Sequence, residues 1–331
     1  MSARALDICI YGAGAVGGSM AVRLAGTGAR VTAVARGAHA EAIRRNGLTL
    51  ISGDQRRTVQ IHCPENLADI APQDVLIVAL KWPSVFEAAA KFSALLKPGG
   101  LIVFAMNSIP WWLADGFDET IKKRLRDALD PDGVLSRAIP AGCIVGAVVR
   151  SANEISEPGI VVNSGPAHNS LTLGMPDGLT PPLLEEFASA LRTAGYGVTM
   201  TPTIREEIWI KNLLASSGGP VAALTGANLG QLVTSTETHE ILAAIMNDGI
   251  AVGRALGFTI TEDIEARLEG FRTRAVRPSM LQDFDLGRPA EIENSILAIA
   301  AMAKALGIAA PVTQTVATLV RMKKSQLLAG G

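Results

Sequence analysis

The sequence predicts an α/β domain built on a parallel sheet, followed by an all-helical second domain. Apolar segments of strand length alternate with helical patterns through residues 1–202, which is typical of a doubly wound sheet. A glycine-rich turn joins the first predicted strand to the first predicted helix, and strand signals disappear from about residue 203. We therefore expect a Rossmann-type domain at 1–202 and a helical domain at 203–331, with the functional cleft between them.

Length and composition limit the classes of protein that fit. The 331 residues exceed the usual size of a single core, and 48% hydrophobic with 18% charged residues is typical of a soluble globular protein. The net charge of −1 argues against an electrostatic surface for nucleic acid or membrane. The apolar runs are too short to span a membrane, and the first strand begins too early for a signal peptide. We expect a cytoplasmic protein with a small-molecule partner; a homodimer is compatible with the sequence, which leaves the oligomeric state open.

The cysteine and histidine patterns predict no metal site. The cysteines are widely separated and form neither a disulfide framework nor a metal-binding motif: Cys9, Cys63 and Cys143. The histidines have no metal-ligand spacing and no paired nucleophile, and we interpret them as surface or loop residues: His39, His62, His168 and His239.

The chain is organised around the stretch ICIYGAGAVGG near its N-terminus. An apolar strand at 8–11 is followed by Gly12, Gly14 and Gly17, which spell G-x-G-x-x-G before a helix at 16–24. Gly12 permits the tight turn, Gly14 lets the backbone approach a pyrophosphate, and Gly17 lets the helix pack closely on the strand. The motif therefore predicts a dinucleotide site.

The first turn of that helix is expected to bind the phosphates. The N–H groups of Gly14, Ala15, Val16 and Gly17 have no carbonyl partner within a helix, and the helix dipole adds positive charge at this end. A purely structural turn is the alternative, since 33 of the 331 residues are glycine. The position of the motif between a strand and a helix favours the dinucleotide site.

Arg36 predicts which dinucleotide is bound. It ends the second predicted strand, at 29–36, where NAD-selective sites carry an acidic residue for the ribose hydroxyls. A guanidinium instead binds a phosphate bidentately. Arg36 therefore favours the 2′-phosphate of NADP(H), with a solvated arginine as the alternative.

The remaining elements of the first half follow in order. We expect a hairpin at 48–61 with its turn at 52–55, a buried strand at 74–80, a helix ending at Lys97 before Pro98-Gly99-Gly100, and a strand at 101–105. The segment at 113–140 is expected to lie outside the pattern of strands and to contain a helix at 119–129. After it we expect strands at 143–149, 159–162, 170–173 and 197–201 and a helix at 183–193.

Polar residues follow two of the buried strands, at the edge where doubly wound folds bind ligands. Lys81 follows the strand at 74–80, and Asn107 follows the next strand. A solvated lysine is the alternative for Lys81. The two tryptophans after Asn107, Trp111 and Trp112, either line the cleft entrance or pack in the core.

The order of these motifs resembles the ketopantoate reductase (2-dehydropantoate 2-reductase) family. In that family, residues matching Lys81 and Asn107 contact cofactor and substrate near the nicotinamide. The resemblance is sharpest at Trp209-Ile210-Lys211, where the family keeps its catalytic lysine at the opening of the second domain. An ammonium group stabilises the negative charge that develops on a ketone oxygen and donates its proton, and burial lowers the pKa of a lysine toward neutrality.

A further part of the family resemblance lies in two segments, PSMLQD at 278–283 and GRPAEIE at 287–293. The resemblance implies that Ser279 binds the substrate carboxylate and that Glu291 orients substrate and lysine. A capping serine and a solvated glutamate are the alternatives.

Two positions depart from the family pattern. The family places asparagines four and eight residues after its lysine, where this chain has Ala215 and Gly219. These positions share a helix face with Lys211, so the cleft wall is smaller and less polar. Ketopantoate is therefore in doubt as the substrate, and with it a place in pantothenate biosynthesis.

Together the sequence predicts an NADPH-dependent reductase that transfers a hydride to the ketone of a 2-oxo acid, with Lys211 as general acid. One alternative is an NADP-dependent dehydrogenase that oxidises a bulkier secondary alcohol. A non-catalytic NADPH-sensing protein is the other, although a sensor needs neither Lys211 nor Glu291.

Overall fold

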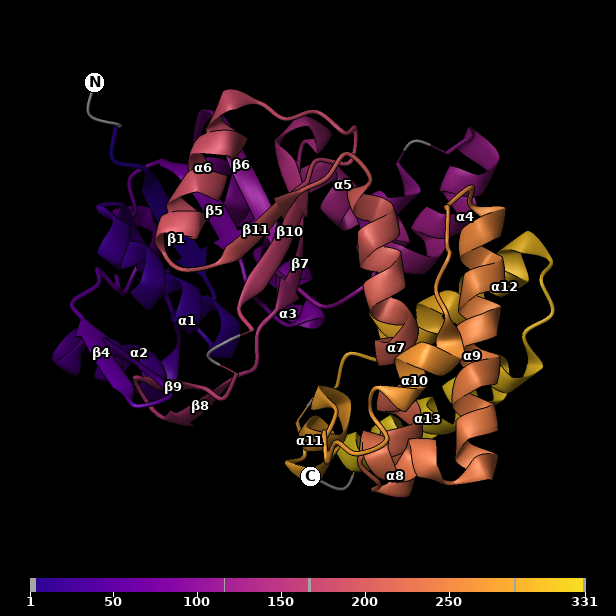
Figure 1. Cartoon of the computed structure of the whole chain (residues 1–331). Helices are drawn as coiled ribbons and strands as arrows, with labels where there is room; N and C mark the ends of the chain where they lie inside the picture. Colours follow the sequence, from indigo (N-terminus) through magenta and orange to yellow (C-terminus); the bar gives the residue numbers. More distant parts are fainter. Residues whose placement is uncertain (1–3, 116, 166–167, 289, 330–331) are drawn as a thin grey trace. The chain divides into compact units, whose positions relative to one another are not determined.

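The computed structural model describes residues 4–115, 117–165, 168–288 and 290–329, and the chain forms two compact units (Figure 1). The N-terminal unit comprises residues up to Asn107 together with Val134–Ile204. The C-terminal unit comprises Ser108–Gly133 and the chain from Arg205 onward.

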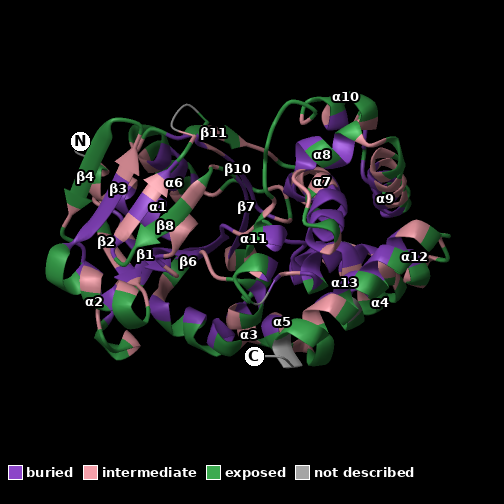
Figure 2. Cartoon of the chain, turned by 90° about the horizontal axis from the view of Figure 1, so that it is seen from below, coloured by how far each residue is buried: buried purple, intermediate pink, exposed green. Residues whose placement is uncertain are grey.

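The N-terminal unit is built on a seven-stranded sheet in the order β11-β10-β7-β6-β5-β1-β2. The strands from β7 to β2 are parallel, and β10 pairs antiparallel with β7. The apolar runs that predicted the inner strands are buried (Figure 2), whereas β2 and β11 at the two edges of the sheet are partly exposed. The strands are β1 (Asp7–Tyr11), β2 (Arg30–Val34), β5 (Gln73–Val78), β6 (Leu96–Phe104), β7 (Ile144–Arg150), β10 (Ser170–Gly174) and β11 (Gly197–Met200).

The order of the parallel strands creates a switch point between β1 and β5. From β1 the chain proceeds to its neighbour β2, whereas β5, β6 and β7 follow one another in the opposite direction across the sheet. At such a point the loops after adjacent strands diverge and leave a crevice at the carboxyl edge, which is where doubly wound sheets bind ligands. The α/β fold class is therefore confirmed.

A second, four-stranded sheet in the order β4-β3-β9-β8 covers the outer side of α1 (Ala15–Leu24). The predicted hairpin forms β3 (Leu48–Ser52) and β4 (Gln55–Val59), which join β9 (Ile160–Asn163) and β8 (Asn153–Glu157). A Cβ at Gly18 would lie 2.9 Å from Cγ2 of Val161 on β9. Because Gly18 has no side chain, α1 fits between the two sheets.

Two expectations for the N-terminal unit were wrong. The helix α3 (Trp82–Phe92) ends before Lys97, and β6 already begins at Leu96. Pairing of Leu96 with Gln73 across a register shift extends the strand through the proline and glycines, so tertiary pairing overrides the local stop signal. The strand β8 was not predicted, because its exposed polar sequence NEISE lacks the apolar run of a buried strand.

The remaining helices of the N-terminal unit cover its sheets or connect its strands. They are α2 (Gly37–Asn46), α5 (Val134–Ala138) and α6 (Pro182–Thr193), together with α3. In the C-terminal unit the described secondary structure is helical, as predicted, and comprises α4 (Glu119–Leu129), α7 (Ile204–Thr225), α8 (Leu229–Thr234), α9 (Thr236–Ala255), α10 (Ile264–Glu269), α11 (Ser279–Asp285), α12 (Ala298–Leu306) and α13 (Pro311–Ala329).

The helix α7 packs closely on α9 through a pair of glycines. A Cβ at Gly253 would lie 2.5 Å from Nε1 of Trp209, and one at Gly249 would lie 2.7 Å from Cδ2 of Leu213. The Trp209 indole N–H also donates a 3.0 Å hydrogen bond to the carbonyl of Gly249. The Trp209 and Leu213 side chains of α7 therefore pack directly against the two glycines of α9. This contact holds α7, the helix that carries Lys211, in place.

The segment 108–133 groups with the C-terminal unit, although the expected division at residue 202 assigned it to the first domain. Its helix α4 packs on α12, and Arg124 donates a 2.6 Å hydrogen bond to the carbonyl of Ala305. The backbone N–H of Ile109 donates to the carbonyl of Asn294 at 2.9 Å, and the Asn294 side-chain amide donates back to Ile109. Long-range packing therefore decides the unit to which this segment belongs.

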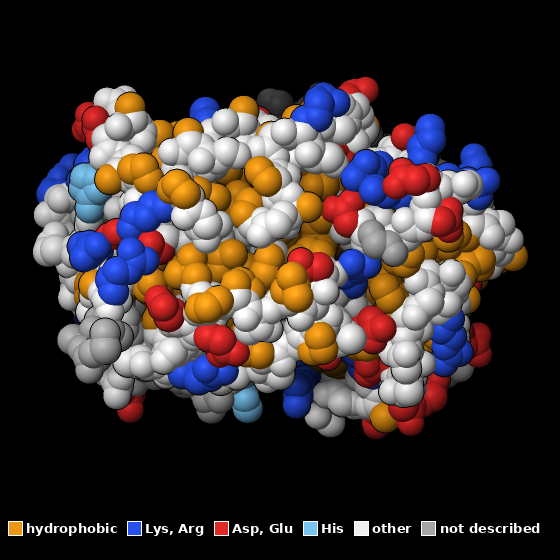
Figure 3. Space-filling model, turned by 90° about the horizontal axis from the view of Figure 1, so that it is seen from above, with side chains coloured by type: hydrophobic (Ala, Val, Ile, Leu, Met, Phe, Trp, Pro, Cys, Tyr) orange, Lys and Arg blue, Asp and Glu red, His pale blue; other side chains and the backbone are white. Residues whose placement is uncertain are grey.

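Figure 3 shows one face of the molecule, on which basic and acidic side chains are interspersed among hydrophobic ones. None of the described helices is long and apolar enough to cross a membrane.

Candidate functional site

The glycine turn closes against the end of β5. Gly12 has a φ of +103°, and a Cβ there would lie 2.6 Å from the carbonyl oxygen of Ala79. A Cβ at Gly17 would collide with the carbonyl oxygen of Gly12 and lie 2.9 Å from Cγ2 of Ile10. Both positions require glycine, because the turn, the end of the neighbouring strand and the start of α1 share one small space.

The turn presents a set of unused N–H donors. The N–H groups of Gly12 and Ala13 both donate to the carbonyl of Val34, at 3.1 and 2.8 Å. The first bond of α1 runs from the Gly18 N–H to the Gly14 carbonyl, so the four N–H groups from Gly14 to Gly17 lack a partner within the helix. Nothing lies within 4 Å of a Cβ placed at Gly14. This open cradle of donors, which includes Ala15 and Val16, fits a pyrophosphate.

Three further candidate residues follow the carboxyl ends of parallel strands on either side of β1. Arg36 follows β2 and directly precedes α2, Lys81 directly precedes α3 after β5, and Asn107 follows β6. All three side chains are exposed. The structure therefore brings these residues and the glycine turn to the same edge of one sheet.

Arg36 is available to an anion. Its guanidinium makes no hydrogen bond or ion pair with another residue that the structure describes, although its backbone carbonyl accepts from the Ala40 N–H. Burial raises the pKa of the Tyr11 hydroxyl at the end of β1, and the nearby Arg36 guanidinium opposes that shift. Arg36 therefore lies near the end of β1, where the glycine turn begins.

The candidate chemical residues all belong to the C-terminal unit. Lys211 lies in α7 and is partly exposed, Ser279 is the exposed first residue of α11, and Glu291 is partly exposed in the segment before α12. Pro289, within the same sequence signature, lies outside the described residues. The Lys324 ammonium donates 2.8 Å hydrogen bonds to the Ala290 carbonyl and to the Glu293 carboxylate. These bonds fix both sides of Glu291.

The start of α11 packs on α7 beside one of the positions that depart from the family pattern. A Cβ at Gly219 would lie 3.5 Å from Cβ and 3.6 Å from Cε of Met280, which is ordinary van der Waals contact. Met280 directly follows Ser279, so α11 brings Ser279 near the face of α7 on which Gly219 lies. Ala215, the other departing position, is exposed.

Both tryptophans after Asn107 are core residues. Trp111 and Trp112 are 2% and 1% exposed. Core packing is therefore the correct interpretation, and neither lines a cleft entrance.

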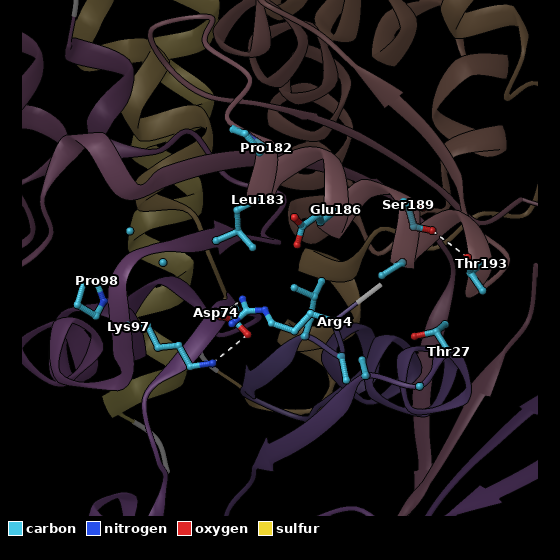
Figure 4. A pocket seen from close by; sticks show the side chains of 17 residues that line it. Arg4, Thr27, Asp74, Lys97, Pro98, Pro182, Leu183, Glu186, Ser189 and Thr193 are labelled. Carbon is cyan, nitrogen blue, oxygen red and sulfur yellow. Dashed lines mark hydrogen bonds and ion pairs between the residues drawn. The ribbon is translucent and has the colours of Figure 1, made fainter. Parts of the chain in front are cut away.

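A cavity of about 970 Å³ lies at the other edge of the main sheet (Figure 4). It is lined by the starts of β1 and β2, the first residues of β6 and one face of α6. Asp74, which lines it, accepts from Arg4 at 2.6 Å and from Lys97 at 3.0 Å. This cavity is separate from the glycine turn.

The ion-pair cluster at this edge extends to Asp7 at the start of β1. Arg30 and Lys97 each lie 2.5 Å from its carboxylate. The Arg30 hydrogen bond in particular lowers the pKa of Asp7 from 3.8 to about 2, and the pKa of Asp74 is lowered as well because the Asp7 N–H, Lys97 and Arg4 outweigh burial. We interpret the cluster as structural.

Sequence reasoning missed His39, which was interpreted as a surface or loop residue. It lies in α2 and is partly buried, and its two ring nitrogens bond to the Ala13 carbonyl and the Gly159 N–H. Its position three residues after Arg36 was the only signal in the sequence. Among the described residues, no group of three or more His, Cys, Asp or Glu is placed to hold a metal ion.

A phosphate-binding glycine turn at the switch point of a doubly wound sheet defines a dinucleotide-binding protein. Comparison with known proteins gives the family. Residues 8–178 match the family model Ketopantoate reductase PanE/ApbA, and residues 203–324 match its C-terminal counterpart. The chain belongs to the ketopantoate reductase family, and it is a dinucleotide-binding oxidoreductase that acts on a ketone or alcohol group.

Relatives cover nearly the whole chain. The 2-dehydropantoate 2-reductase of Mesorhizobium japonicum is 31% identical over 96% of this chain and 97% of its own length. A solved structure of a candidate ketopantoate reductase from Ralstonia solanacearum has a TM-score of 0.89 and 31% identity, covering 98% of this chain and 99% of that one. A structure of D-mandelate dehydrogenase with NADH and anilino(oxo)acetate has a TM-score of 0.82 at 19% identity and covers 97% of this chain and 99% of that one. That last likeness concerns the fold alone.

Proposed function

We propose that this protein is an NADP(H)-dependent reductase that transfers a hydride to the ketone of a 2-oxo acid. The exposed guanidinium of Arg36 beside an open glycine cradle carries the cofactor assignment. Two neighbouring donor sets, one for the pyrophosphate and one for a phosphate on the ribose, match the two anionic parts of NADP(H). Lys81 and Asn107, from the next two strands of the same edge, would contact the nicotinamide half of the cofactor.

In the proposed chemical step, each of the three candidate residues of the C-terminal unit has one role. When bound, the reduced nicotinamide supplies the hydride. The Lys211 ammonium stabilises the charge that develops on the ketone oxygen and donates a proton to it, so the product is a 2-hydroxy acid and the lysine is reprotonated from solvent. The Ser279 hydroxyl donates to the substrate carboxylate, and Glu291 orients the lysine and the substrate.

The substrate is expected to be bulkier and more apolar than ketopantoate. Gly219 offers no side-chain amide, and the Met280 thioether packs on that position instead. Two polar neighbours on α7 do not replace the missing donors, because the Asn212 amide donates to the Ile208 carbonyl and the Ser217 hydroxyl donates to the Leu214 carbonyl. An apolar acyl group would gain about 25 cal/mol per Å² of surface that it buries there.

The experiment that tests this proposal is a comparison of substrates at a fixed NADPH concentration. Ketopantoate and a panel of 2-oxo acids with larger alkyl or aryl groups are compared by kcat/KM from the loss of NADPH absorbance. We expect several-fold higher values for the larger apolar acids. Ketopantoate as the best substrate would contradict the assigned substrate class, and no NADPH oxidation with any 2-oxo acid would contradict the reaction.

The reverse direction is tested with the same enzyme. NADP⁺ and the corresponding 2-hydroxy acids should give slower turnover than reduction at neutral pH. Turnover that favours a bulky secondary alcohol would instead support the dehydrogenase alternative.

A further inference from the structure

His39 connects the glycine turn to the small sheet. Its Nε2 lies 2.8 Å from the carbonyl oxygen of Ala13, between the first two glycines of the motif. Its Nδ1 lies 2.9 Å from the backbone N of Gly159, in the turn between β8 and β9. The Gly159 carbonyl in turn accepts a 2.9 Å bond from the Thr49 N–H on β3. One imidazole therefore joins the glycine turn to a segment that lies 120 residues after His39 in the sequence.

The hydrogen-bond partners determine the tautomer of this histidine. The backbone N–H of Gly159 is always a donor, so Nδ1 must accept and carries no proton. A neutral ring then carries its proton on Nε2, which donates it to the Ala13 carbonyl. His39 thus acts on the turn as a fixed donor whose direction is set by the small sheet.

This donor also fixes the direction of a neighbouring N–H group. The Ala13 carbonyl and the Gly14 N–H belong to one trans peptide, in which the C=O and N–H bonds point in opposite directions. Because the carbonyl points to His39, the Gly14 N–H points away from it. Gly14 opens the cradle whose side-chain position is empty, and the two preceding N–H groups are held by Val34.

We propose that His39 is a positioning residue for the pyrophosphate of the cofactor: its bond to the Ala13 carbonyl holds the Gly14 N–H toward the phosphate. The proposal rests on the proposed binding of NADP(H) at this edge. The pyrophosphate is common to NADPH and NADH, so the contribution of His39 is equal for both cofactors. This separates it from Arg36, which acts only on the 2′-phosphate.

Two substitutions divide the roles of the ring nitrogens. In His39→Asn the side-chain oxygen takes the place of Nδ1 and keeps the bond to Gly159, whereas the donor to Ala13 is lost. In His39→Gln the side-chain amide reaches the place of Nε2 and keeps that donor. The exposed His62, whose substitution His62→Asn changes no contact of the turn, is the matched control.

The test measures the dissociation constants of NADPH and NADH by fluorescence titration, with the melting temperature as a check of folding. We expect His39→Asn to raise both constants by the same factor, about 3- to 10-fold, and His39→Gln and His62→Asn to bind as the unmodified protein does. In steady-state assays the KM for NADPH should rise for His39→Asn while kcat at saturating cofactor stays within about twofold.

Three results would overturn the proposal. The first is unchanged cofactor binding in His39→Asn. The second is a loss of affinity confined to NADPH, which would indicate that Arg36 had been displaced. The third is an equal loss of affinity in the Asn and Gln variants, which would indicate a packing effect. Failure of the unmodified protein to bind either cofactor would instead overturn the proposed function, and it is seen before any variant is made.

Discussion

The two compact units offer different kinds of groups for function. In the N-terminal unit the candidate binding groups are mostly backbone N–H groups, held by a turn between two sheets. In the C-terminal unit they are side chains, Lys211, Ser279 and Glu291, carried by helices and a connecting segment. Backbone donors recognise any dinucleotide phosphate, whereas side chains decide which bond reacts and which substrate fits. We therefore expect variants in the first unit to change cofactor affinity and variants in the second to change turnover.

The largest effect should come from Lys211→Ala. Loss of the proton donor should lower kcat by about 10²- to 10⁴-fold, and the dissociation constant of NADPH should stay nearly unchanged. Stopped-flow kinetics with the best 2-oxo acid and a fluorescence titration measure the two quantities. The exposed Lys304 on α12 provides the control Lys304→Ala, which should leave both unchanged. Turnover near that of the unmodified enzyme would remove Lys211 from the mechanism.

The next effect should come from Arg36→Ala, in the first unit. The variant should lose about 1.5–3 kcal/mol of NADPH binding, a factor of about 10 to 150, because a charge-assisted bond to the 2′-phosphate is lost. NADH binding should be unaffected, since NADH lacks that phosphate. Arg45→Ala, at an exposed position in the last turn of the same helix, is the control. Equal affinity of the unmodified protein for both cofactors would contradict the NADP(H) assignment.

A smaller effect is expected from Gly219→Asn, which returns the family's amide to α7. The new side chain should raise kcat/KM for ketopantoate by about tenfold and lower it for larger apolar acids, because one lost polar contact costs about 1–3 kcal/mol. Its Cβ fits against Met280 in ordinary contact, so we expect the variant to fold. Gly142→Asn, at an exposed glycine with open space around it and no positive φ, controls for the change of residue. Unchanged relative activities would show that Gly219 does not line the substrate site.

The smallest effect concerns charges that act on stability alone. Because Arg30 and Lys97 hold the pKa of Asp7 at about 2, below its ordinary 3.8, its ion pairs stabilise the folded state above about pH 4. That contribution is lost as pH falls through the folded pKa. Asp7→Asn should therefore lower the free energy of unfolding by about 1–2 kcal/mol at pH 7, and the difference should shrink between about pH 4 and 2.

Urea titrations of both proteins at several pH values measure this difference. Asp54→Asn, in the exposed hairpin turn, is the control and should change little. A difference that persists at pH 2 would mean that packing, and not the charge of Asp7, stabilises this edge.

The sequence predicted individual helices, strands and turns better than it predicted which of them pair with one another. The glycine turn was predicted in detail because Gly12 and Gly17 answer steric demands of the neighbouring backbone and Gly14 leaves space open for a ligand. The hairpin was predicted as well, but its union with β8 and β9 depends on pairs more than a hundred residues apart. The start of β6 at Leu96 was missed for a related reason, since pairing with Gln73 overrides a stop signal.

The same distinction between local patterns and distant contacts applies to the residues of the candidate site. Arg36 and Lys81 could be found because they directly follow strands, and Lys211 because a family signature surrounds it. His39 could not, since its role depends on the carbonyl of Ala13 and on Gly159, which no local pattern indicates. Met280 was overlooked because its contact with Gly219 joins two helices distant in sequence.

The cover of α1 by the small sheet has a consequence for synthesis on the ribosome. On the ribosome the glycine turn and α1 emerge before the turn at Gly159, which follows His39 by 120 residues. At about 5–20 residues per second, this interval lasts roughly 6–24 s. During that time β8 and β9 have not been made, so part of the outer face of α1 is uncovered in the nascent chain and is exposed to chaperones. The cofactor loop, although made before these strands, reaches its final form only after them.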